Sequence, residues 1–133
     1  MTRPAPLDAW HRIAATRDAA GLDLLLADEV VFRSPAVHTP QRGKAITTAY
    51  LTAAMHVLGP TLRYLEEWVT ESSDGSGGSA VLEFEADLDG KVVHGVDMVR
   101  WGADDKLTSF TVMVRPFQGL QALMGAMAAQ LAH

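Results

Sequence analysis

The sequence of 133 residues contains no cysteine, has fewer basic than acidic side chains and lacks a long hydrophobic run. Without cysteine, neither a disulfide framework nor a thiolate metal site can form. The net charge of −5 argues against nucleic acid as a partner, because phosphate binding needs a basic face. No stretch is long enough to span a membrane, and residues 1–10 lack the hydrophobic region of a signal peptide. We therefore expect a cytoplasmic protein that binds neither nucleic acid nor membrane.

The length predicts one domain covering residues 1–133, because a chain of this size can bury a core without cross-links. The sequence has no internal repeat, and its one low-complexity stretch, residues 72–79, is typical of a flexible loop. No pair of histidines or carboxylates has the spacing of metal ligands. We expect neither a metal nor a cofactor.

Hydrophobic periodicity divides the chain into helices and strands. It predicts helices that begin near Pro6, near Leu22, at Lys44 and at Pro116. Alternating and β-branched residues predict strands over residues 30–34, 61–71, 80–88, 92–101 and 107–116. Helices followed by a run of strands, with one helix inserted over residues 44–58, are the pattern of an α+β domain. We expect the helices to cover a curved sheet and to leave a conical cavity against it.

Asp97 is an acid at a position where the strand pattern predicts an apolar side chain. Asp89-Gly90 lies between two alternating runs and predicts a two-residue hairpin loop of type I′, which fixes the register and pairs Leu82 with Asp97. Side chains alternate along a strand, so Asp97 shares the apolar face of this hairpin. A carboxylate there must find donors or a cation, or stay protonated because burial raises its pKa.

Four segments carry a family resemblance: residues 26–32 leading into Ser34-Pro35, Gly43-Lys44 at a helix start, residues 96–101, and the turn at 104–106. Together they resemble the nuclear-transport-factor-2-like superfamily, which includes ketosteroid isomerases, SnoaL-like polyketide cyclases, scytalone dehydratase and limonene epoxide hydrolase. The resemblance implies an α+β, cystatin-like fold. In that fold the N-terminal helices and the inserted helix cover a cone-shaped, curved, antiparallel or mixed sheet, and together they form a barrel. The C-terminal helix of this sequence is an extra element of that fold.

The resemblance also implies roles for individual residues. Asp97 falls on the ketosteroid isomerase acid that stays protonated and donates a hydrogen bond to the substrate oxyanion. Ser34 stands where that family has a carboxylate base, and Trp10 stands near its oxyanion tyrosine, so isomerisation by the family route is disfavoured. The epoxide hydrolase pattern is broken as well, because Val112 occupies the position of its last-strand aspartate.

The candidate catalytic residues are Asp97 and His38. Asp97 either faces a ligand or is a structural acid bonded to Trp10 Nε1, a backbone amide or a helix hydroxyl. His38 lies in the loop after Ser34 and is the best replacement for the missing base, because the ordinary pKa of histidine is near neutrality. Alternatively, His38 is a solvated loop histidine. The candidate ligand-binding residues are Trp10, Ser34, Tyr50, Tyr64, Trp68, Phe84, Val99, Phe110 and Val112.

The opposite face of the predicted sheet carries charged residues, among them His94 opposite Glu85, which we interpret as a surface pair. An apolar stripe interrupts these charges and consists of Val92, Val96, Met98, Leu107 and Met113. Such a stripe is usually covered. We therefore expect an isologous homodimer that packs sheet against sheet, the arrangement that the family resemblance also implies.

Three functions are compatible with these residues. The first is an enzyme acting on an apolar, carbonyl-bearing molecule by cyclisation, isomerisation or dehydration, in which Asp97 polarises an oxygen. The second is a non-catalytic module that binds a small apolar ligand in the same cavity. The third is an interaction protein whose dimer is its function.

Overall fold

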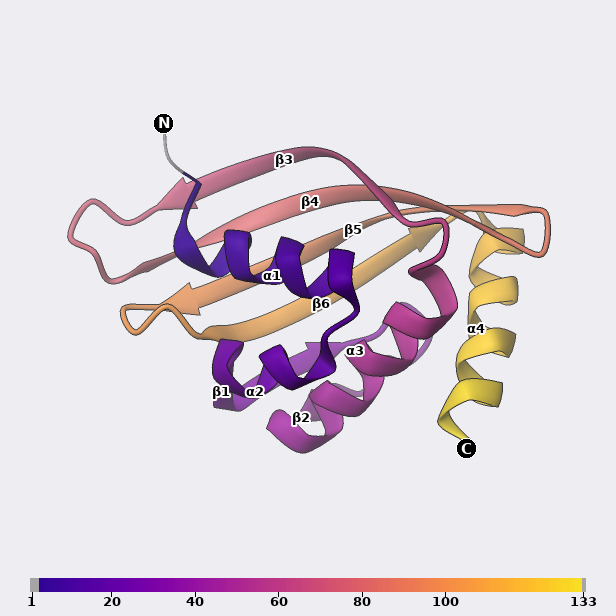
Figure 1. The fold of residues 1–133 in the computed structure, drawn as a ribbon, viewed down its shortest axis with the longest axis horizontal. Helices are drawn as coiled ribbons and strands as arrows, with labels where there is room; N and C mark the ends of the chain where they lie inside the picture. The colour runs from indigo at the N-terminus through magenta and orange to yellow at the C-terminus, as the bar shows by residue number, and fades with distance from the viewer. Residues whose placement is uncertain (1–2, 133) are drawn as a thin grey trace.

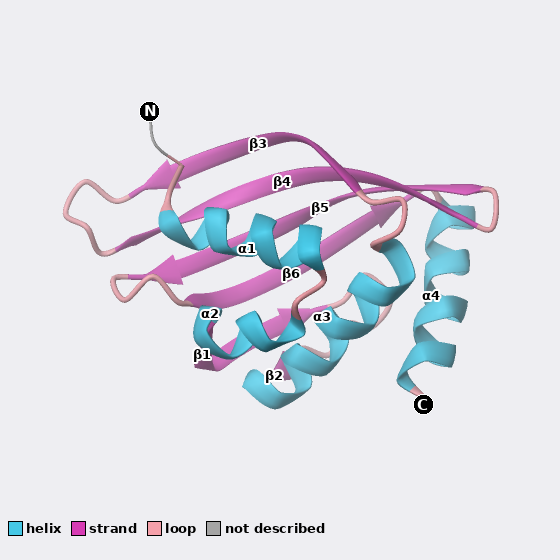
Figure 2. Cartoon of the chain, viewed as in Figure 1, coloured by secondary structure: helices cyan, strands magenta, loops and turns pink. Residues whose placement is uncertain are grey.

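The computed structural model describes residues 3–132, which form an α+β domain (Figure 2). The elements in chain order are α1 (Ala5–Thr16), the 3-10 turn η1 (Ala19–Gly21), α2 (Leu22–Leu25), β1 (Leu26–Arg33), β2 (Gln41–Arg42), α3 (Lys44–Leu58), β3 (Arg63–Glu71), β4 (Gly77–Leu88), β5 (Lys91–Gly102), β6 (Leu107–Arg115) and α4 (Phe117–Leu131). Among the helices of this described part, none has the length and apolar character needed to cross a membrane.

The strands form one mixed sheet in the order β2-β1-β6-β5-β4-β3. Strand β1 runs parallel to β6, whereas the other neighbours are antiparallel. Helices α1, α2 and α3 lie on one face of the sheet, and α4 stands at the end where the β4–β5 hairpin turns (Figure 1). The predicted α+β class and curved mixed sheet are confirmed, but the sheet stays open and does not close into a barrel.

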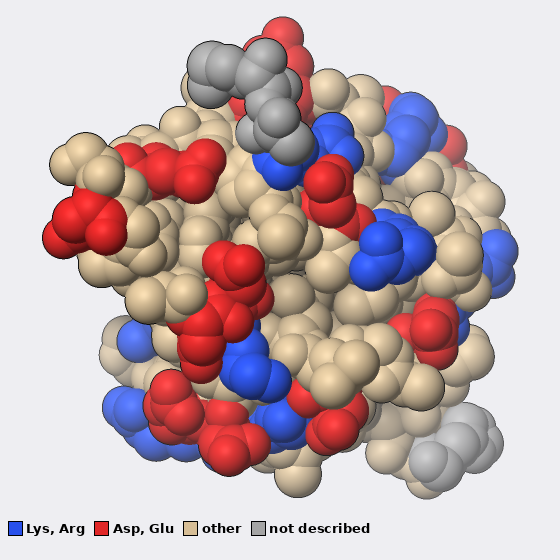
Figure 3. Space-filling model, turned by 60° about the vertical axis from the view of Figure 1, so that its left-hand side comes forward, with Lys and Arg blue, Asp and Glu red and all other residues tan. Residues whose placement is uncertain are grey.

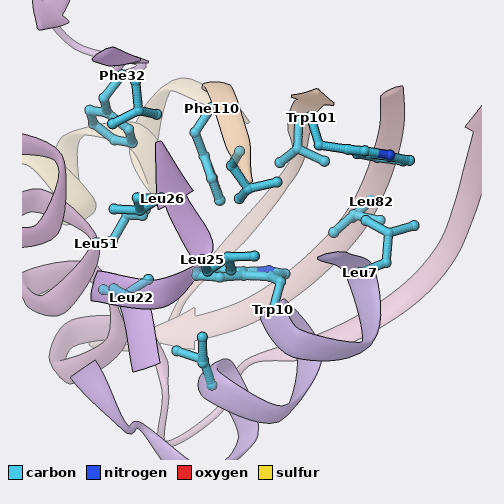
Figure 4. Packing of buried hydrophobic residues seen from close by; sticks show 14 of the residues in the cluster. Leu7, Trp10, Leu22, Leu25, Leu26, Phe32, Leu51, Leu82, Trp101 and Phe110 are labelled. Carbon is cyan, nitrogen blue, oxygen red and sulfur yellow. The ribbon is translucent and has the colours of Figure 1, made fainter. Parts of the chain in front are cut away.

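The N-terminal helices are held on the sheet by a continuous apolar core (Figure 4). Helix α1 follows Pro4 and ends at Thr16; the next residue, Arg17, has a left-handed backbone, which lets the N–H of Asp18 also bond the Ile13 carbonyl. The helix buries Leu7 and Trp10 against the sheet, and the Trp10 ring meets the Phe110 ring edge-on at a centroid distance of 5.0 Å. This packing fixes the position of Trp10 above the middle of the sheet.

The predicted hairpin register is confirmed. Leu82 pairs with Asp97 across β4 and β5, and the loop residues Asp89 and Gly90 have φ angles of 51° and 76°. Both values are positive, as a type I′ turn requires. Strand β1 begins at Leu26, four residues before the predicted start, because the parallel pairing with β6 already includes Leu26.

Two residues lie on the opposite face from the predicted one, each beside an irregularity in strand pairing. A bulge in β3 pairs Tyr64 with Phe84 but Glu67 with Leu82, so the alternation reverses and Trp68 points outward. Trp68 is 54% exposed, and its prediction as a cavity residue is therefore wrong. A second register shift lies after Arg100 in the pairing of β5 with β6.

This second shift pairs Trp101 with Leu107 on the inner face. Leu107 is fully buried in the core, and its prediction as part of the outer apolar stripe is wrong.

On the face of the molecule shown in Figure 3, acidic and basic side chains are intermixed, with apolar and uncharged surface between them. Nζ of Lys44 lies 3.3 Å from Oδ1 of Asp28 and 3.5 Å from Oδ1 of Asp23.

Candidate functional site

Asp97 is buried on the inner face of β5, with 6% of its surface exposed. Its position follows from the hairpin register, which leaves Glu83 and Val96 on the opposite face. Its neighbour on the same face, Gly95, has no side chain, and a Cβ atom at that position would lie 2.8 Å from Cζ of Phe84. The glycine therefore lets the Phe84 ring pack closely against β5 at this position.

The carboxyl group of Asp97 is bonded to a tyrosine. Tyr64 donates its hydroxyl proton to Oδ2 of Asp97 over 2.6 Å, and Nε1 of Trp10 donates to the same hydroxyl over 2.9 Å. A direct bond from Trp10 to Asp97, one of the three partners that the sequence suggested for a structural acid, does not form, because Tyr64 lies between them. Among the described residues, no side chain bonds the second oxygen, Oδ1.

Burial raises the pKa of Asp97 from its ordinary value of 3.8 to about 7, and the hydrogen bond from Tyr64 lowers it in part. Burial and the neighbouring Asp97 carboxylate raise the pKa of Tyr64 well above its ordinary value. The carboxyl group is therefore mostly protonated below neutral pH and ionised above it. It can donate a proton or accept one, while Tyr64 keeps its proton.

Asp97 borders a cavity of about 290 Å³ between the sheet and the helices. The polar groups in its wall are the side chains of Ser34, Tyr50, Tyr64, Asp97 and the indole of Trp10. The apolar part of the wall consists of Ala14, Phe32, Pro35, Ala36, Val37, Leu51, Ala54, Met55, Leu58, Leu62, Phe84, Phe110, Val112, Leu123, Met124, Met127, Ala128 and Leu131. Among these wall residues no arginine, lysine or histidine occurs, so the cavity suits an uncharged, mainly apolar molecule.

Most of the predicted site residues meet in this cavity. Its wall includes Trp10, Ser34, Tyr50, Tyr64, Phe84, Asp97, Phe110 and Val112. Three do not reach it. Trp68 points outward because of the β3 bulge, and Val99 is buried in the core beside the cavity. His38 is exposed in the loop that follows the cavity-lining residues 34–37, and the structure does not bring it to Asp97.

The sequence pattern did not reveal one feature of the site and left a second one open. The first is the hydroxyl of Tyr64 as the partner of Asp97, since Tyr64 was predicted only as an aromatic residue of the cavity or core. The second is the place of α4, for which the sequence allowed either a cover over the cavity or a dimer contact; its Leu123, Met124, Met127 and Leu131 line the cavity. The helical spacing of these apolar residues was a usable signal, but periodicity alone does not say which surface a helix covers.

The Ser34 hydroxyl accepts a hydrogen bond from the backbone N–H of Val37 over 3.2 Å, which holds the loop at the cavity wall. A serine hydroxyl without a neighbouring base does not remove protons at neutral pH. Among the wall residues, Asp97 is therefore the group whose charge changes near neutrality. Within residues 3–132, no group of three or more histidine, aspartate or glutamate side chains is arranged to hold a metal ion.

An open, curved mixed sheet covered by helices, with a buried acid facing an apolar cavity, defines a domain of the nuclear-transport-factor-2-like class. The family model of the SnoaL-like domain matches residues 7–110. This chain belongs to the SnoaL-like family. No curated protein matches it.

Solved structures support the same assignment. A steroid delta-isomerase from Pseudomonas aeruginosa is 38% identical, with a TM-score of 0.85 over 96% of this chain and 90% of that chain. A protein with a cystatin-like fold from Silicibacter pomeroyi is 24% identical, with a TM-score of 0.83 over 96% of this chain and 85% of that chain. A cystatin-like protein from Xanthomonas campestris is 21% identical, with a TM-score of 0.62 over 88% and 95% of the two chains. The last two likenesses concern the fold alone.

Proposed function

We propose that this chain binds a small, apolar, carbonyl-bearing molecule in its cavity and that the carboxyl group of Asp97 donates a hydrogen bond to the carbonyl oxygen. The observation that carries this proposal is the buried acid in an apolar wall, with one oxygen held by Tyr64 and the other without a described partner. A protonated carboxyl group is a strong donor in such surroundings. An anionic ligand is disfavoured, because the described cavity wall contains no arginine, lysine or histidine to balance its charge.

We further propose that the bound molecule is converted by acid–base chemistry at Asp97. A donor at the carbonyl oxygen stabilises the negative charge that develops there when a neighbouring carbon loses a proton. Isomerisation, cyclisation and dehydration share this step. The likeness to a protein described as a steroid delta-isomerase supports this reaction class. Ser34 takes the place of the isomerase base and His38 lies outside the cavity wall, so the proton moves by way of substrate-bound water.

A non-catalytic binding module is the second candidate. One observation favours it: apart from Asp97, the described cavity wall contains no carboxylate and no histidine. A site with a single acid can hold a carbonyl group without moving a proton between carbon atoms. In this case Asp97 contributes affinity and orientation, and no product forms.

The Asp97→Asn variant separates the two candidates. Wild type and variant are mixed with a β,γ-unsaturated steroid ketone, the ultraviolet absorbance of the conjugated product is followed, and binding is measured by quenching of tryptophan fluorescence. An enzyme loses at least about 100-fold in turnover while the variant keeps its fold, as expected when an acid–base group is removed. A binding module loses affinity only, and no conjugated product forms with wild type.

Glu83→Gln is the matched control, because Glu83 is an acid on the paired strand that faces away from the cavity. It should leave both binding and turnover unchanged. If neither this steroid nor a panel of smaller apolar ketones quenches the fluorescence of wild type, the proposed ligand class is wrong. Equal binding by wild type and Asp97→Asn contradicts the proposed role of Asp97.

We also propose that two copies of the chain form a homodimer through the outer face of the sheet. The apolar stripe on that face contains Trp68, Val92, Val96, Met98 and Met113, of which Trp68 and Met113 are 54% and 55% exposed. Burying such side chains removes apolar area from water on association. The proposed cavity lies on the other face, so ligand entry does not depend on this contact.

Sedimentation velocity at micromolar concentration tests the homodimer. We expect a dimer for wild type and a monomer for Met113→Glu, because a buried and unpaired charge in the contact disfavours association. Leu24→Glu is the control, since Leu24 is 77% exposed on α2, away from the outer face of the sheet. A wild-type monomer at this concentration contradicts the proposal.

A further inference from the structure

The hydrogen bonds from Trp10 through Tyr64 to Asp97 have a definite direction. An indole Nε1–H can only donate, so the Tyr64 hydroxyl accepts the bond from Trp10. That hydroxyl has one proton, and the bond of 2.6 Å to Oδ2 of Asp97 uses it. A hydroxyl that accepts one bond becomes a stronger donor in the next, because bonded groups polarise one another.

We propose that Trp10 is a positioning residue that acts through Tyr64, so that the Tyr64 proton is given to Asp97 and the acid proton of Asp97 is the one directed to a ligand. Trp10 has this role in addition to its packing in the core. Tyr64 is a relay in the same chain of bonds and not an independent donor to the ligand. The consequence for the ligand rests on the proposed function, whereas the direction of the bonds does not.

The bulge in β3 prepares this arrangement. By reversing the alternation of the strand, it turns both Tyr64 and Glu67 toward α1. Glu67 is bonded to Nε2 of His11 over 2.8 Å and to Nε of Arg3 over 2.9 Å. These contacts link β3 to His11 in α1 and to Arg3 just before the helix, on both sides of Trp10 in the sequence. Packing restrains the two rings as well, since the His11 ring meets the Tyr64 ring edge-on at 4.9 Å.

The titratable groups around Asp97 come from three elements. Tyr64 on β3 is bonded to it, and Tyr50 on α3 lines the same cavity. Behind Tyr64 lie His11 on α1 and Glu67 on β3, which are bonded to each other. The described cavity residues of β6 and α4 are apolar. A change in the Asp97 titration on mutation of Trp10 therefore has Tyr64 as its direct route.

Nuclear magnetic resonance can follow this route without any ligand. The side-chain carboxyl carbon of Asp97 is titrated in protein labelled with carbon-13, and the indole N–H signals of Trp10, Trp68 and Trp101 are recorded in the same samples. We expect the Trp10 signal to shift with the Asp97 midpoint, because ionisation strengthens the bond from Tyr64 and hence the bond from Trp10. Trp68 and Trp101 are internal controls that do not follow this midpoint.

Variants then separate the bond from the packing. Tyr64→Phe removes the bond to the carboxylate and should raise the Asp97 midpoint by about one pH unit. Trp10→Phe weakens the donor strength of Tyr64 and should raise the midpoint by about a fifth of that amount, since such cooperativity changes bond strength by about 10–30%. In the Tyr64→Phe background, Trp10→Phe should produce no further shift, because the relay is already missing.

Two results overturn the proposal. One is a Trp10 indole signal that stays constant while Asp97 titrates, which can be measured in wild type even if Trp10→Phe does not fold. The other is an equal midpoint shift from Trp10→Phe with and without the Tyr64 hydroxyl, which identifies a change in burial as the cause. A positive titration result combined with no ketone binding contradicts the proposed function and leaves the role of Trp10 standing.

Discussion

The two faces of the β4–β5 hairpin treat acidic side chains in different ways. On the outer face, Glu83 lies 2.8 Å from His94, and Glu85 is paired with Arg63. On the inner face, Asp97 has a hydroxyl as its partner, and burial raises its pKa to about 7. The outer face of these two strands therefore holds acids that are paired with basic side chains where water is close. The inner face holds an acid that has no cationic partner where water is excluded.

This difference indicates which acid is available for chemistry. An acid paired with a basic side chain at the surface adds little to stability. A buried acid whose pKa is near neutrality costs stability when it ionises, and such groups are concentrated at functional sites. On the inner face, the acid with this stability cost borders a cavity, where a bound ligand can accept its proton.

Asp97→Asn removes the difference between the two faces and has the largest expected effect. Because the folded state binds the Asp97 proton more tightly than the unfolded state, the free energy of unfolding falls as pH rises from about 4 to about 7. A rise in pKa from 3.8 to about 7 corresponds to about 4 kcal/mol, at about 1.36 kcal/mol per pKa unit. Urea denaturation of both proteins at pH 4 and pH 8 measures this difference.

We expect the variant to be more stable than wild type at pH 8 by up to about 4 kcal/mol and to lose that advantage at pH 4. Other carboxylates titrate in this range, but they are shared by both proteins and cancel in the comparison. A constant difference between the two proteins from pH 4 to pH 8 contradicts a raised pKa. It would mean that the carboxyl group is solvated in the folded state.

The sequence was sufficient to predict Asp97 on the inner face, because the Asp89-Gly90 loop permits one register and the side chains alternate from there. The same reasoning failed for Trp68 and Leu107, each of which lies beside a shift in pairing. A bulge adds one residue to one strand without a characteristic residue pattern. Alternation counted from the nearest turn is therefore valid only as far as the first bulge.

The apolar wall of the site was largely predictable, whereas its polar partner was not. Trp10, Phe84 and Phe110 have the spacing of buried residues in their elements, and that spacing is local information. The bond between Tyr64 and Asp97 joins residues 33 positions apart, and its geometry depends on the bulge in β3. The role of α4 depends likewise on where the helix packs, which its own periodicity does not specify.

Gly95→Ala adds one methyl group to the inner face and has the next largest expected effect. The new Cβ would lie 2.2 Å from the carbonyl oxygen of Met113 and 2.8 Å from Cζ of Phe84, so β6 or the ring must move. We expect a loss of about 1–3 kcal/mol in the free energy of unfolding, the usual range for overpacking. Urea denaturation at pH 6 measures it.

Gly125→Ala is the matched control, because a Cβ there has no atom within 4 Å and the position is inside α4. It should stabilise the protein by about 0.5–1 kcal/mol through helix propensity. An effect of Gly95→Ala no larger than that of a substitution at an exposed position would show that the inner face beside Asp97 is loosely packed.

Glu83→Gln on the outer face has the smallest expected effect. Arg115 donates to Nδ1 of His94 over 3.3 Å, and an arginine can only donate, so the proton on Nε2 of His94 is the one given to Glu83. A glutamine carbonyl oxygen accepts the same proton, and the pair is partly exposed. We therefore expect a loss of about 0.2–1 kcal/mol in the free energy of unfolding, measured by urea denaturation. A loss of about 4 kcal/mol, equal in size to the gain expected for Asp97→Asn at pH 8, would mean that water is excluded from the outer face as well. The contrast between the two faces would then have another cause than burial.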